Sequence, residues 1–115
     1  MNSRNKGCVG ERELSNILRN TYGYDTRRGQ QFCGANGDAD VIGLDGIHIE
    51  CKRVERLNVS DAMAQSIRDA RQGEMPTVFH RKNREQWLVT MRLDDFMSLY
   101  ANMRGTNNEC ETRAE

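Results

Sequence analysis

Three charged residues near the middle of the sequence, Asp40, Glu50 and Lys52, have the types and spacing of a metal-dependent hydrolytic site. Side chains alternate between the two faces of a strand, so Glu50 and Lys52 share one face of the strand predicted over 47–54. Two carboxylates can bind Mg²⁺, and a neighbouring ammonium can orient an attacking water and offset charge that develops on a phosphate. The alternative is an ordinary ion pair between exposed charges on a hairpin.

The turn before this strand decides whether Asp40 joins Glu50 on the same face. A two-residue loop, 45–46, would turn Asp40 to the opposite face, whereas a three-residue loop, 44–46, places it across from Glu50. The longer loop suits Gly46, because glycine readily adopts the left-handed backbone conformation of a bulged turn. We therefore predict the three-residue loop, with the two carboxylates facing each other.

Further metal ligands can be proposed from neighbouring segments. The backbone carbonyl of Cys51 could supply a third oxygen ligand beside Asp40 and Glu50. Glu11 lies at the edge of the core-facing stripe of a helix predicted over 10–22, where it could hold an outer-shell water or a second metal. The expected cofactor is Mg²⁺, with Mn²⁺ as a substitute, because these cations prefer oxygen ligands.

The elements around these residues predict one domain over residues 1–104, followed by a polar, disordered tail over 105–115. The order of elements predicts an α/β fold with a mixed five-stranded sheet flanked by helices, rather than a doubly wound fold. Hydrophobic periodicity and turn residues predict helices over 10–22, 60–72 and 94–102, and strands over 24–31, 39–44, 47–54, 77–81 and 86–91.

The helix predicted over 60–72 directly follows the strand that carries Glu50 and Lys52. Ser60 is a favourable N-cap for it. Met63, Ile67 and Ala70 recur at helical spacing, so we expect them to form its buried, apolar stripe.

Composition excludes several classes of protein. Hydrophobic residues make up 37% and charged residues 30% of the chain, and no apolar run is long enough to cross a membrane. The polar N-terminus lacks the apolar stretch of a secretory signal, so we expect a cytoplasmic protein without a membrane partner. The four cysteines form no C-x-x-C pair and match no zinc-binding spacing, which predicts reduced thiols.

The net charge is zero, but the basic residues are unevenly distributed. Acidic residues concentrate in the C-terminal segment, which leaves a positive balance over 1–92. Arg27, Arg28, Gln30 and Lys82 are candidate contacts to DNA phosphates. From the residues alone, the alternative that these are solvated loop side chains stays open.

Three other side chains favour structural interpretations. His48 shares the face of Glu50, but we expect it near solvent at the end of a hairpin, since Mg²⁺ prefers oxygen to nitrogen ligands. Asp38 suits a turn in a glycine-bearing loop. Trp87 lies in an apolar strand, where we expect it in the core or in a dimer interface.

Together these features resemble the PD-(D/E)XK nuclease superfamily, in which an Asp at the start of one hairpin strand precedes a D/E-x-K motif on the next. Here the motif reads Asp40 and then Glu50-Cys51-Lys52, with Ala39 where the superfamily usually has proline. Within the superfamily the chain looks most like archaeal-type Holliday junction resolvases and their phage relatives. The further matching segments are Glu11-Arg12-Glu13-Leu14, Arg27-Arg28 and the glycine-bearing loop 34–37.

The resemblance implies a restriction-endonuclease-like α/β/α core and Mg²⁺-dependent cleavage of DNA. It further implies a four-way (Holliday) junction as substrate and a homodimer that makes paired cuts. Relatives often carry a glutamine on the helix after the motif strand, which Gln65 matches; the alternative is a solvent-facing position.

Two other functions stay open. The chain could be another DNA nuclease of the same superfamily, acting in repair, restriction or phage recombination. It could also be a non-catalytic DNA-binding module that keeps the fold. In each case we expect it in the cytoplasm of a bacterial, archaeal or phage-infected cell.

Overall fold

The computed structural model describes the backbone of residues 3–29 and 39–114 and the side chains of 8–29 and 39–105, and within these residues it has three helices and five strands. The strands form one mixed sheet in the order β1-β2-β3-β4-β5, in which β3 and β4 are parallel and all other neighbours antiparallel. The first helix begins earlier than predicted, and the first two strands are shorter. The elements are α1 (Ser3–Asn20), β1 (Arg27–Arg28), β2 (Val41–Ile42), β3 (Ile47–Arg53), α2 (Val59–Asp69), β4 (Met75–Arg81), β5 (Leu88–Met91) and α3 (Leu93–Ala114).

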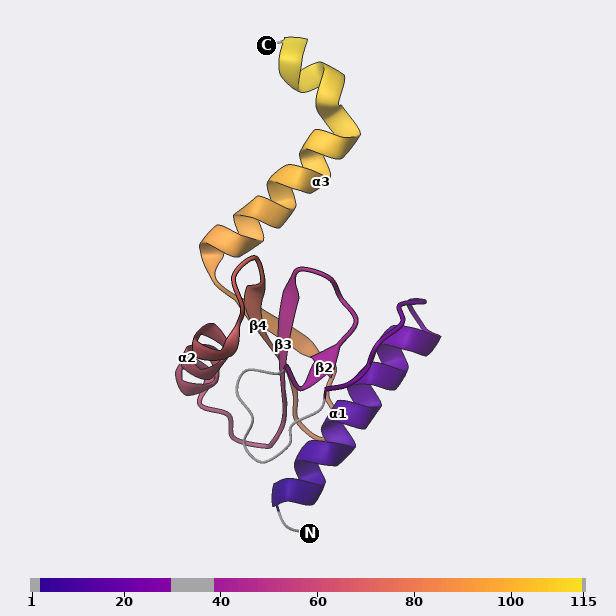
Figure 1. Cartoon of the computed structure of the whole chain (residues 1–115), viewed down its shortest axis with the longest axis vertical. Helices are drawn as coiled ribbons and strands as arrows, with labels where there is room; N and C mark the ends of the chain where they lie inside the picture. Colours follow the sequence, from indigo (N-terminus) through magenta and orange to yellow (C-terminus); the bar gives the residue numbers. More distant parts are fainter. Residues whose placement is uncertain (1–2, 30–38, 115) are drawn as a thin grey trace.

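Helices α1 and α2 cover opposite faces of the sheet, while α3 extends away from it (Figure 1). Gly10 of α1 lies over Cys51, and a Cβ on this glycine would come within 2.7 Å of the Cβ of Arg53. On the other face, Gln65 of α2 reaches Lys52. Successive residues of β3 point to opposite faces, so these contacts define the two outer layers. The predicted α/β/α core, like that of restriction endonucleases, is confirmed.

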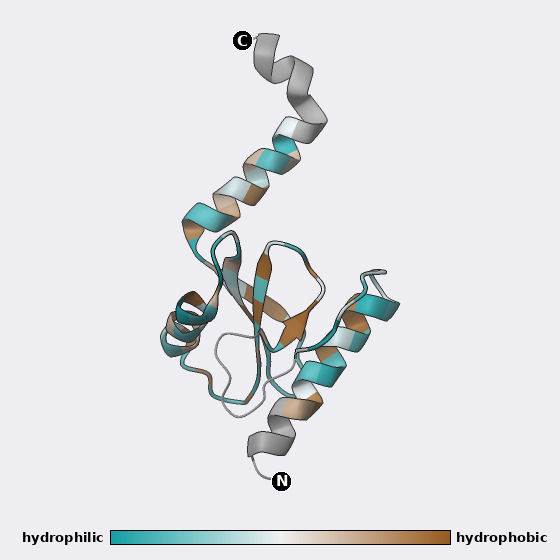
Figure 2. Ribbon diagram, viewed as in Figure 1, coloured by the Kyte–Doolittle hydropathy of each residue, from teal (hydrophilic) through white to brown (hydrophobic). Residues whose placement is uncertain are grey.

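The hydrophobic core lies between α1 and the centre of the sheet. Leu14 packs there against Val41, Ile49 and Cys51, all of them buried. Figure 2 shows the matching concentration of hydrophobic residues on β2 and β3. The predicted alternation along β3, with apolar side chains on one face, is therefore confirmed. None of the helices among the described residues is long and apolar enough to span a membrane.

The β2–β3 hairpin has the predicted register but not the predicted turn. Val41 pairs with Ile49, as a three-residue loop would require. The turn itself closes through the N–H of Ile47, which donates to the carbonyl oxygen of Leu44 at 3.1 Å, so it is centred on 45–46. Val41 lies three positions before Leu44, whereas Ile49 lies only two positions after Ile47. The extra residue therefore lies before the turn.

Gly43 accommodates this extra residue. Its φ of 123° is a conformation that residues with a side chain rarely adopt. A Cβ at this position would also lie 2.5 Å from the carbonyl oxygen of Asp25. The register of the hairpin thus depends on a glycine at 43, while Gly46 provides the positive φ of 84° that the turn needs.

Helix α2 is rotated about its axis relative to the prediction. Its buried residues are Ala62 and Ser66, whereas Ile67 of the predicted stripe is 44% exposed. The hydroxyl of Ser66 donates to the carbonyl oxygen of Thr77 on β4 at 2.9 Å. Small side chains let the helix approach the sheet closely, so close packing and this hydrogen bond decide the orientation of α2 more than its larger apolar residues do.

Two helix ends also differ from the prediction. The N-cap of α2 is Asn58 rather than Ser60, because the Asn58 side chain accepts a hydrogen bond from the N–H of Asp61 at 3.0 Å. Helix α3 begins at Leu93, and it continues through most of the segment 105–115 that we expected to be a disordered tail.

Candidate active site

The two carboxylates predicted as metal ligands are both buried: Asp40 lies just before β2, and Glu50 lies in β3. Asp40 is 7% exposed and Glu50 is 3% exposed. The carboxylate of Asp40 accepts a hydrogen bond from the N–H of Cys51 at 2.8 Å, and its own N–H donates to the carbonyl of Ile49 at 2.9 Å. Asp40 is thus fixed against the backbone of β3 at the two residues that flank Glu50. The alternative of exposed hairpin charges does not hold for these two acids.

Lys52 and Gln65 meet on the α2 face of the sheet. The ammonium nitrogen of Lys52 donates to Oε1 of Gln65 at 3.4 Å. Gln65 neighbours the buried Ala62 and Ser66 on the wheel of α2, so it is turned toward β3. In the structure, Gln65 is therefore partly buried against β3 rather than facing solvent.

His48 is buried, and the prediction of a solvent-facing position is wrong. It is 1% exposed, with Nε2 at 3.5 Å from Oε1 of Glu50 and Nδ1 at 3.6 Å from Oε1 of Glu74. Helix α2 and the segment before β4 cover this end of the strand. Burial lowers the pKa of His48, but the nearby carboxylates of Glu50, Glu74 and Asp69 outweigh it and raise the pKa above its ordinary value.

Asp69 is a site residue that sequence reasoning missed. Potential ligand atoms of His48, Glu50 and Asp69 all lie within 4.8 Å of one another, the one such group in the part of the chain that the structure describes. Asp69 is the last residue of α2 and lies seven positions after Ala62, which places both on one helix face. The predicted apolar stripe pointed to a different face, so the pattern gave no signal for Asp69.

Glu11 lies on α1, which covers the face of the sheet opposite to that of Glu50. Its carboxylate is 3.1 Å from Nε of Arg28, and the other end of this guanidinium contacts the sulfur of Cys8 at 3.2 Å. The hydrogen bond to Glu11 is the main cause that raises the pKa of Arg28. Glu11 is not part of the His48 group, so the structure brings it to an arginine rather than to that group.

The predicted phosphate contacts are dispersed over the surface. Arg27 and Lys82 are exposed, and Arg28 is held by Glu11. Gln30 and Asp38 lie outside the described residues.

A polar hollow lies at the ends of β3 and β4, next to the predicted phosphate contact Lys82. Glu13 joins two of its arginines, at 3.1 Å from Arg53 and 2.6 Å from Arg81. Arg53 also donates to the side chain of Asn83 at 2.6 Å. The hollow is lined by Arg53, Glu55, Arg81, Asn83 and Arg84.

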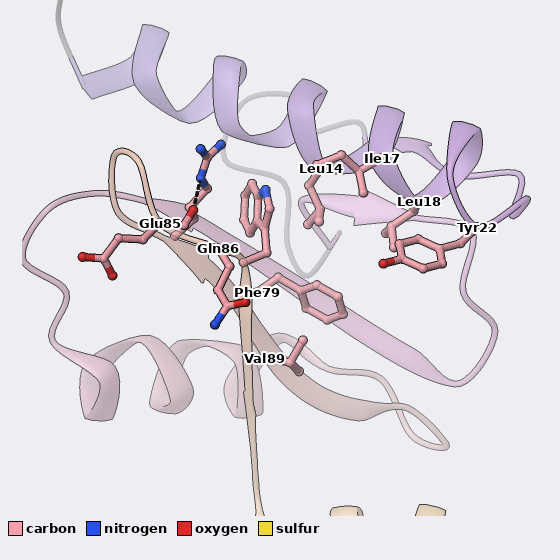
Figure 3. Close-up of a pocket in the computed structure, with 10 residues that line it drawn as sticks. Leu14, Ile17, Leu18, Tyr22, Phe79, Glu85, Gln86 and Val89 are labelled. Atoms are coloured by element: carbon pink, nitrogen blue, oxygen red, sulfur yellow. Dashed lines mark hydrogen bonds between the residues drawn. The ribbon is translucent and has the colours of Figure 1, made fainter.

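A separate pocket on the α1 face is mainly apolar (Figure 3). Leu14 and Leu18 of α1 line it, together with Phe79 and Val89 of the sheet. Trp87 also lines it and packs against the core, as predicted, although its Nε1 has no hydrogen-bond partner among the described residues. The pocket lies on the opposite face of the sheet from Glu50, so it is not part of the acidic site.

Cys51 belongs to the core rather than to any thiol site. Burial, followed by the nearby charge of Asp40, raises the pKa of the Cys51 thiol far above its ordinary value. Cys8 and Cys51 are both free thiols, as expected for the cysteines that the structure describes.

Comparison with models of protein families identifies a family for this chain. A search of curated proteins finds no match to this chain. A family model described as "phage putative PDDEXK endonuclease" matches residues 2–113, and therefore includes Asp40, Glu50 and Lys52. This match supports the PD-(D/E)XK superfamily. Because the family model covers almost the entire chain, the protein belongs to this phage PDDEXK endonuclease family.

Proposed function

We propose that this protein is a metal-dependent endonuclease that hydrolyses the DNA backbone and that its substrate is branched DNA, namely four-way junctions. The observation that carries the proposal is the burial of two carboxylates: Asp40, which accepts a hydrogen bond from the N–H of Cys51, and Glu50, two positions before Lys52 in β3. Burying charged carboxylates is costly unless their charge is compensated. A divalent cation is the form of compensation that also promotes phosphodiester hydrolysis.

The donor atoms beside β3 suit a hard divalent cation such as Mg²⁺. Asp40 and Glu50 offer carboxylate oxygens, and the peptide group of Cys51 adjoins Asp40. The N–H and C=O of one strand residue point to the same side, so the carbonyl of Cys51 is directed toward the side of Asp40. When bound, Mg²⁺ or Mn²⁺ would polarise the phosphate and lower the pKa of a water.

Lys52 and Gln65 act on the substrate in this proposal. Their hydrogen bond holds the ammonium of Lys52 on the same face as Glu50. Its positive charge offsets the negative charge that develops on the phosphate during hydrolysis. The amide nitrogen of Gln65 remains available as a donor to a phosphate oxygen, since only its oxygen is used by Lys52.

Glu11 and the basic residues would position DNA. Glu11 forms an ion pair with Arg28. In this proposal Glu11 therefore orients that arginine toward DNA rather than binding a metal directly. Arg84 of the polar hollow and the adjacent Lys82 are exposed and suited to phosphates.

The apolar face of α3 supports the homodimer. Large side chains along one side of this helix are exposed, among them Phe96, Leu99, Tyr100 and Met103. Phe96 and Tyr100 stack on each other, with ring centroids 6.5 Å apart. A helix with such a face extends away from the sheet (Figure 1), so we infer that a second copy covers it.

The activity is tested with end-labelled four-way junctions and linear duplexes of the same sequences, in Mg²⁺, Mn²⁺ or EDTA. We expect cleavage of junctions in either metal and none in EDTA. Asp40→Asn should lower the rate by on the order of 10²-fold. Asp45→Asn removes an exposed carboxylate from the same hairpin and should leave the rate unchanged.

Two outcomes would contradict the proposal at different levels. Equal cleavage of junctions and linear duplexes would exclude the junction preference and leave a general DNA nuclease. Binding of DNA without cleavage of any form would instead favour the non-catalytic module.

The dimer is tested by light scattering coupled to gel filtration. We expect Phe96→Glu to give monomers, while Asn102→Glu, on the polar side of α3, should leave the dimer intact. A wild-type chain that is monomeric at all concentrations would exclude the dimer.

A further inference from the structure

His48 is in an environment that its own hydrogen bonding does not explain. Its side chain is 1% exposed, and neither ring nitrogen makes a hydrogen bond with any described residue. Buried polar groups almost always have a partner, because an unpaired one loses its hydration without replacement. An imidazole without such partners is therefore the first indication of a ligand.

Carboxylates surround this imidazole from three different segments of the chain. Glu50 of β3 lies 3.5 Å from Nε2, and Glu74, just before β4, lies 3.6 Å from Nδ1. Asp69, at the end of α2, completes a group whose ligand atoms are within 4.8 Å of one another. Three acids and one histidine leave this cluster negatively charged even when His48 is protonated.

The position of Asp69 adds a second electrostatic cost. It is the last residue of α2, where the helix dipole places partial negative charge and disfavours a carboxylate. A cation between Asp69 and Glu50 would offset both this effect and the repulsion between the two acids.

The geometry matches a common mode of histidine ligation. Donor atoms around a tetrahedral ion with bonds of about 2.1 Å are roughly 3.4 Å apart, close to the distance from His48 to Glu50. Histidines that bind metals usually direct their other nitrogen to a carboxylate, which fixes the ring and increases its basicity. Glu74 occupies this position beside Nδ1.

We propose that His48, Glu50 and Asp69 bind a divalent transition-metal ion of the Zn²⁺ type, with Glu74 orienting the imidazole. One nitrogen and two carboxylate oxygens favour such an ion over Mg²⁺, which prefers oxygen alone. The site shares Glu50 with the proposed catalytic centre but does not include Asp40. Binding of the ion to this site can be measured without any DNA substrate.

The experiment adds Zn²⁺ or Co²⁺ to the metal-free full chain. Calorimetry measures Zn²⁺ binding, and visible absorption reports the ligands of Co²⁺. We expect one Zn²⁺ site per chain, bound more tightly than Mg²⁺. His48→Gln and Asp69→Asn should each weaken Zn²⁺ at least about tenfold, whereas His80→Gln, at the only other histidine of the chain, should bind as the wild type does.

Glu74→Gln provides a variant that keeps all three ligands. We expect it to weaken Zn²⁺ by roughly tenfold, and circular dichroism checks the folding of every variant. Undiminished affinity in His48→Gln would overturn the proposal, as would charge-transfer absorption from a cobalt–thiolate bond. If His48→Gln does not fold, undiminished affinity in both Asp69→Asn and Glu74→Gln would overturn it.

Asp40→Asn separates this site from the nuclease function. We expect this variant to lose DNA cleavage and to keep the Zn²⁺ affinity of the wild type. Loss of Zn²⁺ binding together with cleavage would assign the ion to the Asp40 centre and overturn the separate site.

Discussion

The two faces of β3 consist of alternate residues of one strand, yet they hold opposite kinds of side chain. Toward α1, Ile49 and Cys51 are buried in the hydrophobic core. Toward α2, His48 and Glu50 are equally buried but polar and charged. Burial therefore does not distinguish the core from the candidate site. Burial of the first face stabilises the fold, whereas burial of the second costs stability, which the first must offset.

The largest expected effect on function comes from removing one charge on the acidic face. Glu50→Gln keeps the size of the side chain but removes a carboxylate, so we expect the rate of DNA cleavage to fall by on the order of 10²–10³-fold. Stability to urea should not fall, because the lost charge was costly to bury. A rate within a few-fold of the wild type would contradict a catalytic role for this face.

The opposite effect is expected one residue earlier in the strand. Ile49→Ala leaves a cavity among Leu14, Val41 and Cys51, and should lower the free energy of unfolding by about 2–5 kcal/mol. Cleavage per folded molecule should remain close to that of the wild type. Ile67→Ala is the matched control, because Ile67 is 44% exposed on α2 and should change stability by at most about 0.5 kcal/mol. An equal loss of stability in both variants would show that Ile49 of β3 does not contribute to the hydrophobic core.

A smaller effect tests the hairpin that sets both faces in register. Gly43→Ala combines an unfavourable φ with contact to the backbone at Asp25, and should cost about 2–3 kcal/mol. Gly46→Ala has open space around the added Cβ and only an unfavourable φ, so it should cost about 1 kcal/mol. Urea denaturation measures both. A larger loss at Gly46 would contradict the placement of the extra residue at Gly43.

The smallest expected effect concerns pH and His80, the neighbour of Lys52 across β3 and β4. Burial lowers the pKa of His80 in the folded protein. The unfolded chain then takes up a proton more readily, so this residue stabilises the fold above the unfolded pKa of about 6.5 and loses that contribution as the pH falls. We expect His80→Gln to lose less stability than the wild type between about pH 7.5 and 5.5 in urea denaturation. A steeper loss of stability in the variant would show that folding raises the pKa of His80 rather than lowering it.

Strand alternation was sufficient to predict much of the hairpin. The apolar residues of β3 and the need to bury Val41 with them fixed the pairing of Val41 with Ile49, and the structure has that pairing. The turn was not predictable in the same way. Gly46 has a positive φ in either arrangement, and the choice of Gly43 for the extra residue depends on the backbone at Asp25, which is distant in sequence.

The residues that sequence reasoning missed depend on tertiary packing. Periodicity identified α2 but assigned its buried side to Ile67, whereas the hydrogen bond from Ser66 to β4 helps to set the observed orientation. With α2 turned in this way, Asp69 faces His48 and the end of the hairpin is covered. No local pattern carries this information, because it requires the docked position of a helix. The roles of Asp40, Glu50 and Lys52 remain predictions that the experiments above test.

The parallel pairing of β3 with β4 has a consequence for the order of folding. The β2–β3 hairpin joins segments that are close in sequence, whereas Thr77 reaches the carbonyl of His48 across 29 residues. Closing that long loop costs chain entropy before any contact compensates for it. We therefore expect the hairpin and its apolar face to form early and the acidic face to assemble last. If the protein is the nuclease that we propose, a newly synthesised chain would gain its activity only after the segment that forms β4 had left the ribosome.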